Sequence, residues 1–460
     1  MVKTQEIFII FFSILIIFLL TKLLISNPNI LFLGLILATL ILFISFFSPQ
    51  VGLVFLIFSM LLSPEIKLAD VPGREVVVRI DDLLIAAVFL GWFAKSIFTK
   101  KLEIVVTGPL LPIFLYTIVC IISTYLGVIS GRIVLTKAFF YLLKYLEYFT
   151  IYFLTTQIVK TKKQLEIYLL LFIITSIIVN IHGYTLIGKV ERLYAPFDKP
   201  SAVIGGGEVG SGEANTYGGY LLIVISLLIS LFCYSDNVNL SSMYIFLTIF
   251  SLIPFAYTKS RSSYLGFVFM TITLIVLTEK KKILILTSLL LLFVLSPIIF
   301  PQATQTVVER IKETFAEKTT SQEEATVLGF KIRELSALAR IQSWKKMFNE
   351  FIPKRPVLGF GVTGVGLVDT QIPLIVGETG LLGLTIFLWL VISVFDSTYK
   401  VFKTSNDLLY KSISLCVFSS LVGLLFQSTA ANTFIIIRIM EPFWFLTGIA
   451  TVLPQIEKYG

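Results

Sequence analysis

Charged side chains are scarce in this sequence of 460 residues, because Asp, Glu, Lys and Arg together make up only 14% of it. A typical soluble globular protein has about a quarter. Hydrophobic residues account for 56%, and apolar runs of about 20 residues, the length that crosses a bilayer as a helix, recur along nearly the whole chain. This excludes a water-soluble globule, and it also excludes a soluble domain with a single membrane anchor.

Cysteine and histidine are also scarce. The three cysteines, Cys120, Cys233 and Cys416, all lie inside apolar runs, which argues against disulfides and thiolate metal sites. The single histidine, His182, cannot form a metal cluster alone. We therefore expect neither a metal nor another cofactor.

Basic residues outnumber acidic ones and give a net charge of +9. In a soluble protein this excess would suggest nucleic acid. Here the basic residues lie in loops that flank apolar runs, where they orient a chain in the bilayer. The expected partner is therefore the lipid bilayer, and no nucleic-acid partner is expected.

The apolar runs predict an all-α polytopic membrane protein with about 12–14 transmembrane helices, forming a single integral membrane domain over residues 1–460. The run at 50–63 is short and bounded by prolines, so the lower numbers apply if it does not cross. Two polar segments, 188–213 and 301–370, interrupt the series. The second is expected to contain amphipathic helices, since Val307, Val308, Ile311 and Phe315 share one helical face. The runs lie near 7–25, 30–48, 50–63, 82–98, 108–128, 135–157, 165–187, 214–234, 240–257, 262–278, 282–299, 371–396, 407–428 and 433–453.

Lysine clusters predict the orientation, because under this span count they fall on one side of the membrane. The positive-inside rule makes that side cytoplasmic, so both termini lie inside, and 188–213 and 301–370 are external loops. The clusters are Lys95, Lys100 and Lys101; Lys160, Lys162 and Lys163; Lys280, Lys281 and Lys282; and Lys400, Lys403 and Lys411.

Arginine follows the opposite pattern, since every arginine falls on the predicted external side, whereas lysine occurs on both sides. A guanidinium group donates two parallel hydrogen bonds to phosphate oxygens, so the bias points to a lipid headgroup or a substrate that carries phosphate. Compositional drift in loops is the alternative. The arginines are Arg74, Arg79, Arg132, Arg192, Arg261, Arg310, Arg333, Arg340, Arg355 and Arg438.

Two of these arginines stand in polar breaks between apolar spans. Arg192 directly follows a helix end, and Arg261 lies in the short turn TKSRSSY at residues 258–264. No structural partner for Arg192 is visible in the sequence. At the depth of Arg261 an arginine requires a partner, which is either a lipid phosphate at the surface or an anionic substrate in an internal cavity. Asn215 begins the helix after the first break, where it caps the helix or binds substrate.

The second polar segment contributes two more candidates. Arg340 belongs to a stripe with Arg333, Ser336 and Trp344, where it contacts a substrate or stacks on the Trp344 ring. Arg355 precedes a GxGxxG pattern at Gly359, Gly361 and Gly364. The pattern lacks the strand and βαβ context of a dinucleotide site, so we interpret its glycines as a tight loop close to helices.

Carboxylates complete the candidate set. Asp369 stands at the mouth of a span, and Glu378 lies nine residues further on, within it. A carboxylate inside the membrane suggests function, and the alternative is an ion pair with an arginine such as Arg438. Lys144 and Glu147 lie three residues apart within a helix and are interpreted as a structural ion pair.

These features, in this order, resemble the O-antigen ligase/O-antigen polymerase superfamily of bacterial envelope glycan enzymes. The likeness is carried by KAFFYLLKYLEYF, by RLYAPF with GEANTYGGYL, by TKSRSSYLG, and by the block from RIQSW through RPVLGFG to DTQIPLIVGETGLLGL. The resemblance implies a membrane architecture like that of C-type glycosyltransferases. It also implies the bacterial inner (cytoplasmic) membrane, with the active site on the periplasmic face.

What the resemblance implies for activity is metal-independent transfer of a glycan from an undecaprenyl-pyrophosphate donor to an acceptor glycan or lipid. Arg192 and Arg261 match the two essential external arginines of family ligases. Asp369 stands where the ligases have a histidine, the proposed base, and this favours a polymerase. The alternatives are ligation to a lipid A core or a protein, a flippase or other transporter, and a scaffolding protein. The expected catalytic residues are Asp369, Arg192 and Arg261, and the expected substrate-binding residues are Arg340, Asn215, Glu378, Arg438 and Arg355.

Overall fold

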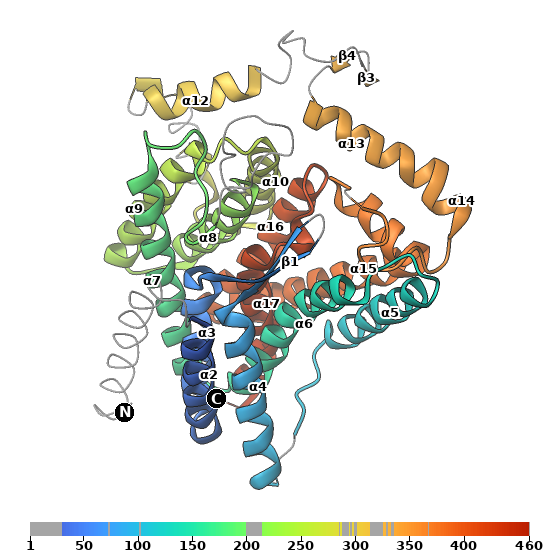
Figure 1. Ribbon diagram of the computed structural model, residues 1–460. Coiled ribbons are helices and arrows are strands. Elements are labelled where there is room, and N and C mark those ends of the chain that lie inside the picture. The colour runs from blue at the N-terminus through green and yellow to red at the C-terminus, as the bar shows by residue number, and fades with distance from the viewer. Residues whose placement is uncertain are drawn as a thin grey trace.

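The computed structural model shows a bundle of helices that is crossed at one end by further helices (Figure 1). The first predicted span, 7–25, and most of the run 282–299 lie outside the residues that the structure describes. Those residues are 30–71, 74–100, 103–198, 214–284, 286–287, 294, 297–298, 301–312, 325–327, 330–332, 335–366 and 368–459.

A helix stands at each of the twelve other predicted spans, so the all-α polytopic fold is confirmed. Among the described residues, seven helices are long and apolar enough to cross a membrane, namely α5, α7, α8, α9, α15, α16 and α17, and α2, α3 and α10 are apolar but shorter. The twelve are α2 (Ile30–Phe47), α3 (Pro49–Leu62), α4 (Ile80–Phe98), α5 (Leu110–Ile129), α6 (Leu135–Ile158), α7 (Lys162–Leu186), α8 (Ala214–Tyr234), α9 (Val238–Tyr257), α10 (Arg261–Leu277), α15 (Gln371–Thr404), α16 (Leu408–Ser428) and α17 (Ile437–Tyr459).

The connecting segments hold elements that differ in part from the sequence prediction. The long segment before α15 contains α12 (Pro301–Lys312) and α13 (Leu335–Lys346), followed by a π-helical turn (Met347–Phe351) and α14 (Ile352–Lys354). Helices were predicted there, and α12 carries Val307, Val308 and Ile311 of the expected apolar face, whereas Phe315 lies outside the described residues. Figure 1 shows α12 and α13 across one end of the bundle.

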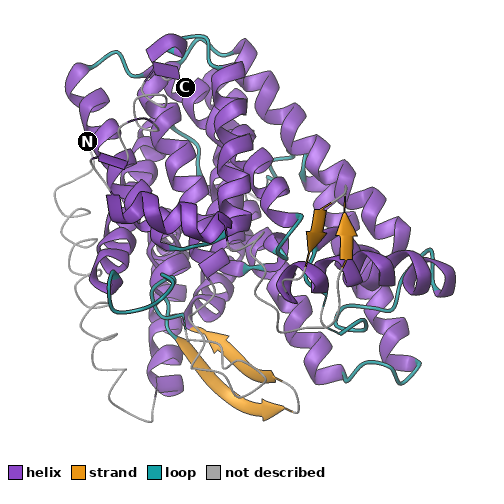
Figure 2. Ribbon diagram, turned by 90° about the horizontal axis from the view of Figure 1, so that it is seen from above, coloured by secondary structure: helices purple, strands orange, loops and turns teal. Residues whose placement is uncertain are grey.

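Two short antiparallel hairpins were not predicted. One joins α3 to α4 and pairs β1 (Glu65–Val71) with β2 (Arg74–Arg79), and the other pairs β3 (Ala325–Val327) with β4 (Phe330–Ile332). The sequence REVVVR of β2 contains a run of β-branched residues, which favour strands. Figure 2 shows the two hairpins as separate pairs of orange arrows.

Ion pairs join the segments of three of the four lysine clusters at one end of the bundle. Lys162 at the start of α7 pairs with Asp407 in the α15–α16 turn. Glu279 after α10 pairs with Lys403 at 2.6 Å and with Lys411 at 3.5 Å. These contacts join loops that the sequence placed on one side of the membrane. Because consecutive spans reverse direction, the loops that carry Arg192 and Arg261 lie at the opposite end.

Close helix packing in the core depends on small residues and on interlocked aromatic rings. A Cβ atom added to Gly266 of α10 would lie 2.5 Å from the carbonyl oxygen of Gly423 in α16, so only glycine allows the two backbones to approach so closely. Between α6 and α17, the rings of Phe149 and Tyr152 lie edge-on to Trp444, with centroids 5.2 and 5.5 Å away.

Helix α15 is interrupted at Gly380, which has φ 70° and ψ −169°. A loop before the helix fills the break. The N–H of Phe360 donates to the carbonyl of Gly377 at 2.8 Å, and the N–H of Leu381 donates to the carbonyl of Pro356 at 2.7 Å. Backbone groups inside a membrane must be satisfied by protein, and here the loop supplies the hydrogen bonds that the interrupted helix gives up.

The GxGxxG pattern belongs to this loop, so its interpretation as a tight loop close to helices is confirmed. Gly359 and Gly361 have φ 62° and 92°, a region that disfavours other residues. A Cβ on Gly359 would lie 2.6 Å from the carbonyl oxygen of Gly377, and one on Gly361 would lie 2.9 Å from the carbonyl oxygen of Ser123. The glycines therefore allow the loop backbone to touch both α15 and α5.

We expect Gly380→Ala to destabilise the protein by about 2–4 kcal/mol, because it combines backbone strain with a collision. The new Cβ would lie 2.2 Å from the carbonyl oxygen of Val357. Gly131→Ala is the matched control, since Gly131 has φ 69° but no heavy atom within 4 Å of an added Cβ. Thermal unfolding of the detergent-solubilised variants measures the difference. Equal losses in the two variants would show that the loop does not depend on this close approach.

Candidate functional site

The structure brings Arg192 to the turn that carries Arg261. The Nε and Nη2 atoms of Arg192 lie 3.4 and 3.5 Å from the carbonyl oxygens of Thr258 and Lys259. The N–H of Leu193 donates to the carbonyl of Tyr257 at 3.1 Å. Because Arg261 is the first residue of α10 and directly follows this turn, two arginines that are distant in the sequence belong to one assembly of loops.

A buried polar network lies beneath this turn. The Oδ1 atom of Asn215 accepts hydrogen bonds from the hydroxyls of Ser260 and Ser262 at 2.7 and 3.1 Å. The Nε2 atom of Gln427 donates to the carbonyl of Asn215 at 2.8 Å and to the hydroxyl of Ser263 at 3.0 Å. The side chain of Asn215 therefore joins α8 to the arginine turn. The sequence analysis did not identify Gln427, although a glutamine near the end of an apolar run can indicate a buried polar contact.

The segment 427–434 connects this network to Asp369. At its far end, the side-chain amide of Asn432 donates to the carbonyl of Val368, and the N–H of Phe434 donates to Oε1 of Gln371 at 3.0 Å. Asp369 itself has an exposed side chain, and its N–H donates to the hydroxyl of Ser343 at 3.2 Å. One short segment thus contacts both the arginine turn and the loop of the candidate base.

Arg340 and Arg355 lie on the segment that precedes α15. Arg340 is half-buried on α13, one helical turn before the Ser343 that holds the Asp369 backbone. The guanidinium carbon of Arg355 lies 5.8 Å from the ring centroid of Phe360, within the docked loop. Trp344, the suggested stacking partner of Arg340, is stacked with Phe348 at a centroid distance of 6.3 Å.

Glu378 is buried beside the break in α15. Its Oε1 atom accepts a hydrogen bond from the N–H of Thr363 at 2.7 Å, and the hydroxyl of Tyr145 lies 3.5 Å from its Oε2 atom. The aromatic interior next to Tyr145 holds a hollow of only about 10 Å³, which has room for one water molecule at most. A glycan therefore cannot reach Glu378 through this part of the core.

Arg438 is buried at the start of α17, with 3% of its surface exposed. Its Nη1 atom donates to the carbonyls of Leu61 at 3.1 Å and Pro196 at 2.7 Å. Its Nε atom lies 3.6 Å from Oδ1 of Asp198. Arg438 therefore ties the end of α3 to the loop that begins with Arg192, and its partners differ from the Glu378 that was considered in the sequence.

Sequence reasoning missed a buried acidic cluster between α4 and α17. Arg79 forms a close ion pair with Asp81 and lies 3.6 Å from Glu441, all three being buried. Glu147 of α6 faces this cluster and interacts electrostatically with its acids, among them Asp82. Asp81 and Asp82 lie in the first turn of α4, and the local sequence does not indicate that their partners lie on other helices.

The predicted ion pair of Lys144 with Glu147 is wrong, because no such pair forms among the residues described. The Nζ atom of Lys144 lies 4.9 Å from the ring centroid of Tyr141. Glu147 is instead directed to the acids of α4 and α17. The side chains of Lys144 and Glu147 lie on the same helix, but each interacts with different neighbours.

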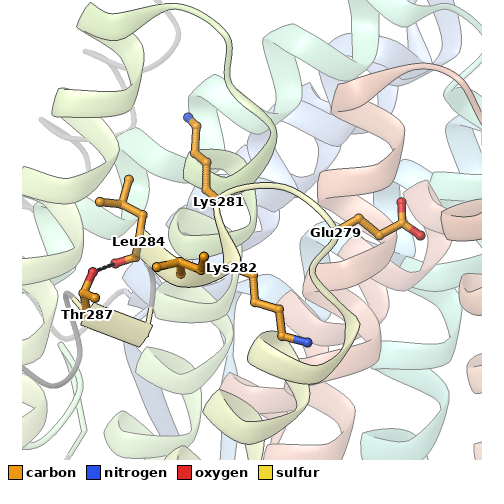
Figure 3. Close-up of a pocket in the computed structure, with 6 residues that line it drawn as sticks. Glu279, Lys281, Lys282, Leu284 and Thr287 are labelled. Atoms are coloured by element: carbon orange, nitrogen blue, oxygen red, sulfur yellow. Dashed lines mark hydrogen bonds between the residues drawn. The ribbon is translucent and has the colours of Figure 1, made fainter.

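A hollow of about 510 Å³ lies at the lysine end of the bundle. In Figure 3, the side chains of Glu279 and Lys281 at its edge point away from each other. The amine of Lys281 donates to the carbonyls of Phe232 and Ser235 at 2.9 and 2.6 Å, which closes the end of α8. This hollow lies at the end opposite Arg192 and Arg261, and it is not part of the candidate site.

Comparison with known proteins finds a family match that includes part of this assembly of loops. Residues 246–388 match the family model for O-antigen ligase. The match supports assignment of the chain to the O-antigen ligase/polymerase superfamily, whose members are glycosyltransferase-like enzymes, and the resemblance found in the sequence is thereby confirmed. The matched segment includes Arg261, Arg340, Arg355, Asp369 and Glu378. Comparison with curated proteins finds no match.

Proposed function

We propose that this superfamily member transfers a glycan from an undecaprenyl-pyrophosphate donor to an acceptor hydroxyl, on the external face of the bacterial inner membrane. The observation that carries the proposal is the contact of Arg192 with the turn of Arg261. It supports a single site with two guanidinium groups at the end of the bundle opposite the lysine clusters. The family match includes Arg261 and supports the same class of activity.

The proposed chemistry follows from the charge that develops during transfer. The acceptor oxygen attacks the anomeric carbon while the bond from that carbon to the phosphate oxygen breaks, and the diphosphate leaves with the bonding electron pair. Fixed guanidinium groups stabilise this growing negative charge. We assign this role to Arg192 and Arg261, whose loops are held by backbone contacts and by the Asn215 network.

Asp369 is the proposed acceptor of the proton from the attacking hydroxyl. Its side chain is exposed, while its backbone is held by Ser343, and that of the preceding residue by Asn432. The held backbone restricts where this carboxylate can lie, and we assign it to orienting the hydroxyl and taking its proton.

The five residues expected to bind substrate are assigned to two different roles. Arg340 and Arg355 lie at least partly open to the exterior and are proposed to contact substrate. Asn215, Glu378 and Arg438 make buried contacts within the protein and are proposed to position the loops.

The favoured reaction is polymerisation of lipid-linked repeat units into O-antigen or exopolysaccharide, because Asp369 replaces the histidine of ligase relatives. The second candidate is ligation of glycan to a lipid A core or to a protein, which the description of the matching family as O-antigen ligase favours. Both reactions use the same donor and the same leaving group, so the two arginines serve either one.

Gel analysis of surface glycan from a deletion strain is expected to show single repeats on their final carrier, because loss of a polymerase leaves the later transfer step intact. Complementation with the wild-type chain provides the control. Full-length chains that accumulate on undecaprenyl pyrophosphate would instead identify the protein as the ligase.

Arg192→Lys and Arg261→Lys are each expected to lower polymer formation about 10²-fold or more, because lysine keeps the charge but loses the forked hydrogen bonds. Immunoblots of membranes are expected to show normal amounts of protein. Lys189→Arg, an exposed exchange in the loop of Arg192, is the control and should retain activity. A near-normal amount of polymer from either lysine variant would show that the arginine replaced in it only anchors the loop to lipid.

Asp369→Asn is expected to lower turnover about 10²–10⁴-fold, the range that general base catalysis contributes. The amide keeps the shape of the carboxylate and an acceptor oxygen but cannot take the proton. Asp369→His is expected to restore part of the activity. Turnover is measured in reconstituted membranes with lipid-linked substrate, and wild-type turnover of the Asn variant would exclude Asp369 as the base.

A further inference from the structure

Two arginines share one aromatic ring at the side of the bundle formed by α5 and α6. The guanidinium carbon of Arg132, in the α5–α6 turn, lies 5.9 Å from the ring centroid of Phe360, and that of Arg355 lies 5.8 Å from the same centroid. Cations within about 6 Å of a ring are attracted to its face. The ring therefore holds two positive groups from separate loops close together.

Neither arginine has an acidic partner in the part of the chain that the structure describes. The other polar contact of Arg132 is a long hydrogen bond of 3.4 Å to the carbonyl of Leu126. Partial desolvation, together with the positive charge of Arg355, lowers the pKa of Arg132 below its ordinary value. By contrast, Arg79 and Arg438 both lie beside carboxylates.

The platform beneath the two arginines is fixed from both sides. The hydroxyl of Ser123 in α5 donates to the carbonyl of Glu378 in α15 at 2.6 Å. The N–H of Val362, two residues after Phe360, donates to the hydroxyl of Thr124 at 3.1 Å. The Phe360 loop is therefore held between α5 and α15, so the ring that both guanidinium groups approach is in place before any anion arrives.

Apolar side chains surround this pair and are exposed. Ile129, Val134 and Leu135 flank Arg132 along the chain, Val357 follows Arg355, and each of these four side chains is more than half exposed. In a membrane protein, such a surface faces lipid chains, and arginine beside it lies at the level of the headgroups. The chemistry that fits this surface is a lipid tail attached to an anionic head.

We infer that Arg132 and Arg355 bind the diphosphate of a second lipid-linked molecule, the acceptor, which rests on the proposed polymerisation. Polymerisation joins two lipid-linked glycans, so two diphosphates must be held at once. Arg192 and Arg261 hold the diphosphate of the donor beside α10, whereas the second pair lies at α5 and α14, elsewhere in the bundle (Figure 1). Two forked cations match a diphosphate better than the single charge of a phosphodiester lipid.

The test counts bound undecaprenyl diphosphate by native mass spectrometry, using the purified full-length protein in phosphatidylcholine nanodiscs. Wild-type protein is expected to bind two molecules. Arg132→Gln and Arg355→Gln are each expected to bind one of the two about tenfold more weakly, since each removes charge-assisted hydrogen bonds. The second molecule should remain bound, which also shows that the variants are folded. Lys163→Gln, an exposed change at the lysine end, is the control and should bind both.

The outcomes separate this inference from the proposed function. If wild-type protein binds one molecule, and only Arg192→Gln and Arg261→Gln weaken it, the second site is overturned while the proposed function stands. Phosphatidylglycerol that displaces the Arg132-dependent molecule at equal concentration would make the pair an anchor for bulk phospholipid, and this also overturns the inference. If wild-type protein binds no undecaprenyl diphosphate, the proposed function itself fails.

Discussion

The docking of residues 356–361 into the break of α15 is the constraint on which the surrounding structure depends. A membrane helix can leave its regular path only where other protein groups take over its hydrogen bonds. The contacts of Phe360 with Gly377 and of Leu381 with Pro356 do this. The same docking places Glu378 beside Thr363 and presents the ring of Phe360 to two arginines. The docking of one loop thus determines the position of several candidate side chains.

Arginine has two distinct roles at the end of the bundle opposite the lysine clusters. Arg438 and Arg79 are buried and bound to carbonyls or carboxylates, so they fasten loops and helices to one another. Removing one partner of such a buried pair leaves a charge without compensation, which is strongly destabilising. Arg132 is exposed instead. The bias of arginine towards one face therefore reflects both assembly of the protein and the anionic chemistry proposed for it.

The sequence predicts the spans well because apolar runs of bilayer length have few other solutions, and twelve of them coincide with described helices. The tight loop around Gly359 was also predictable, since glycine-rich segments without a βαβ context favour close backbone approach. The hairpin of β1 and β2 was not predictable, because the alternation of apolar and polar residues in its strands is short. The partner of Glu147 was not predictable either, because it lies on other helices and depends on how α4, α6 and α17 pack. The proximity of Arg192 to the Arg261 turn likewise arises from tertiary contacts between distant loops.

The segment 427–434 acts as a molecular spacer. Its ends are fixed by Gln427 to the backbone of Asn215 and by Asn432 to the backbone of Val368, and only a few residues lie between these ties. Changes in bilayer thickness alter the tilt of individual spans, but a spacer this short keeps the distance between its two ends nearly constant. The two ties therefore limit how far the turn of Arg261 and the loop of Asp369 can move apart.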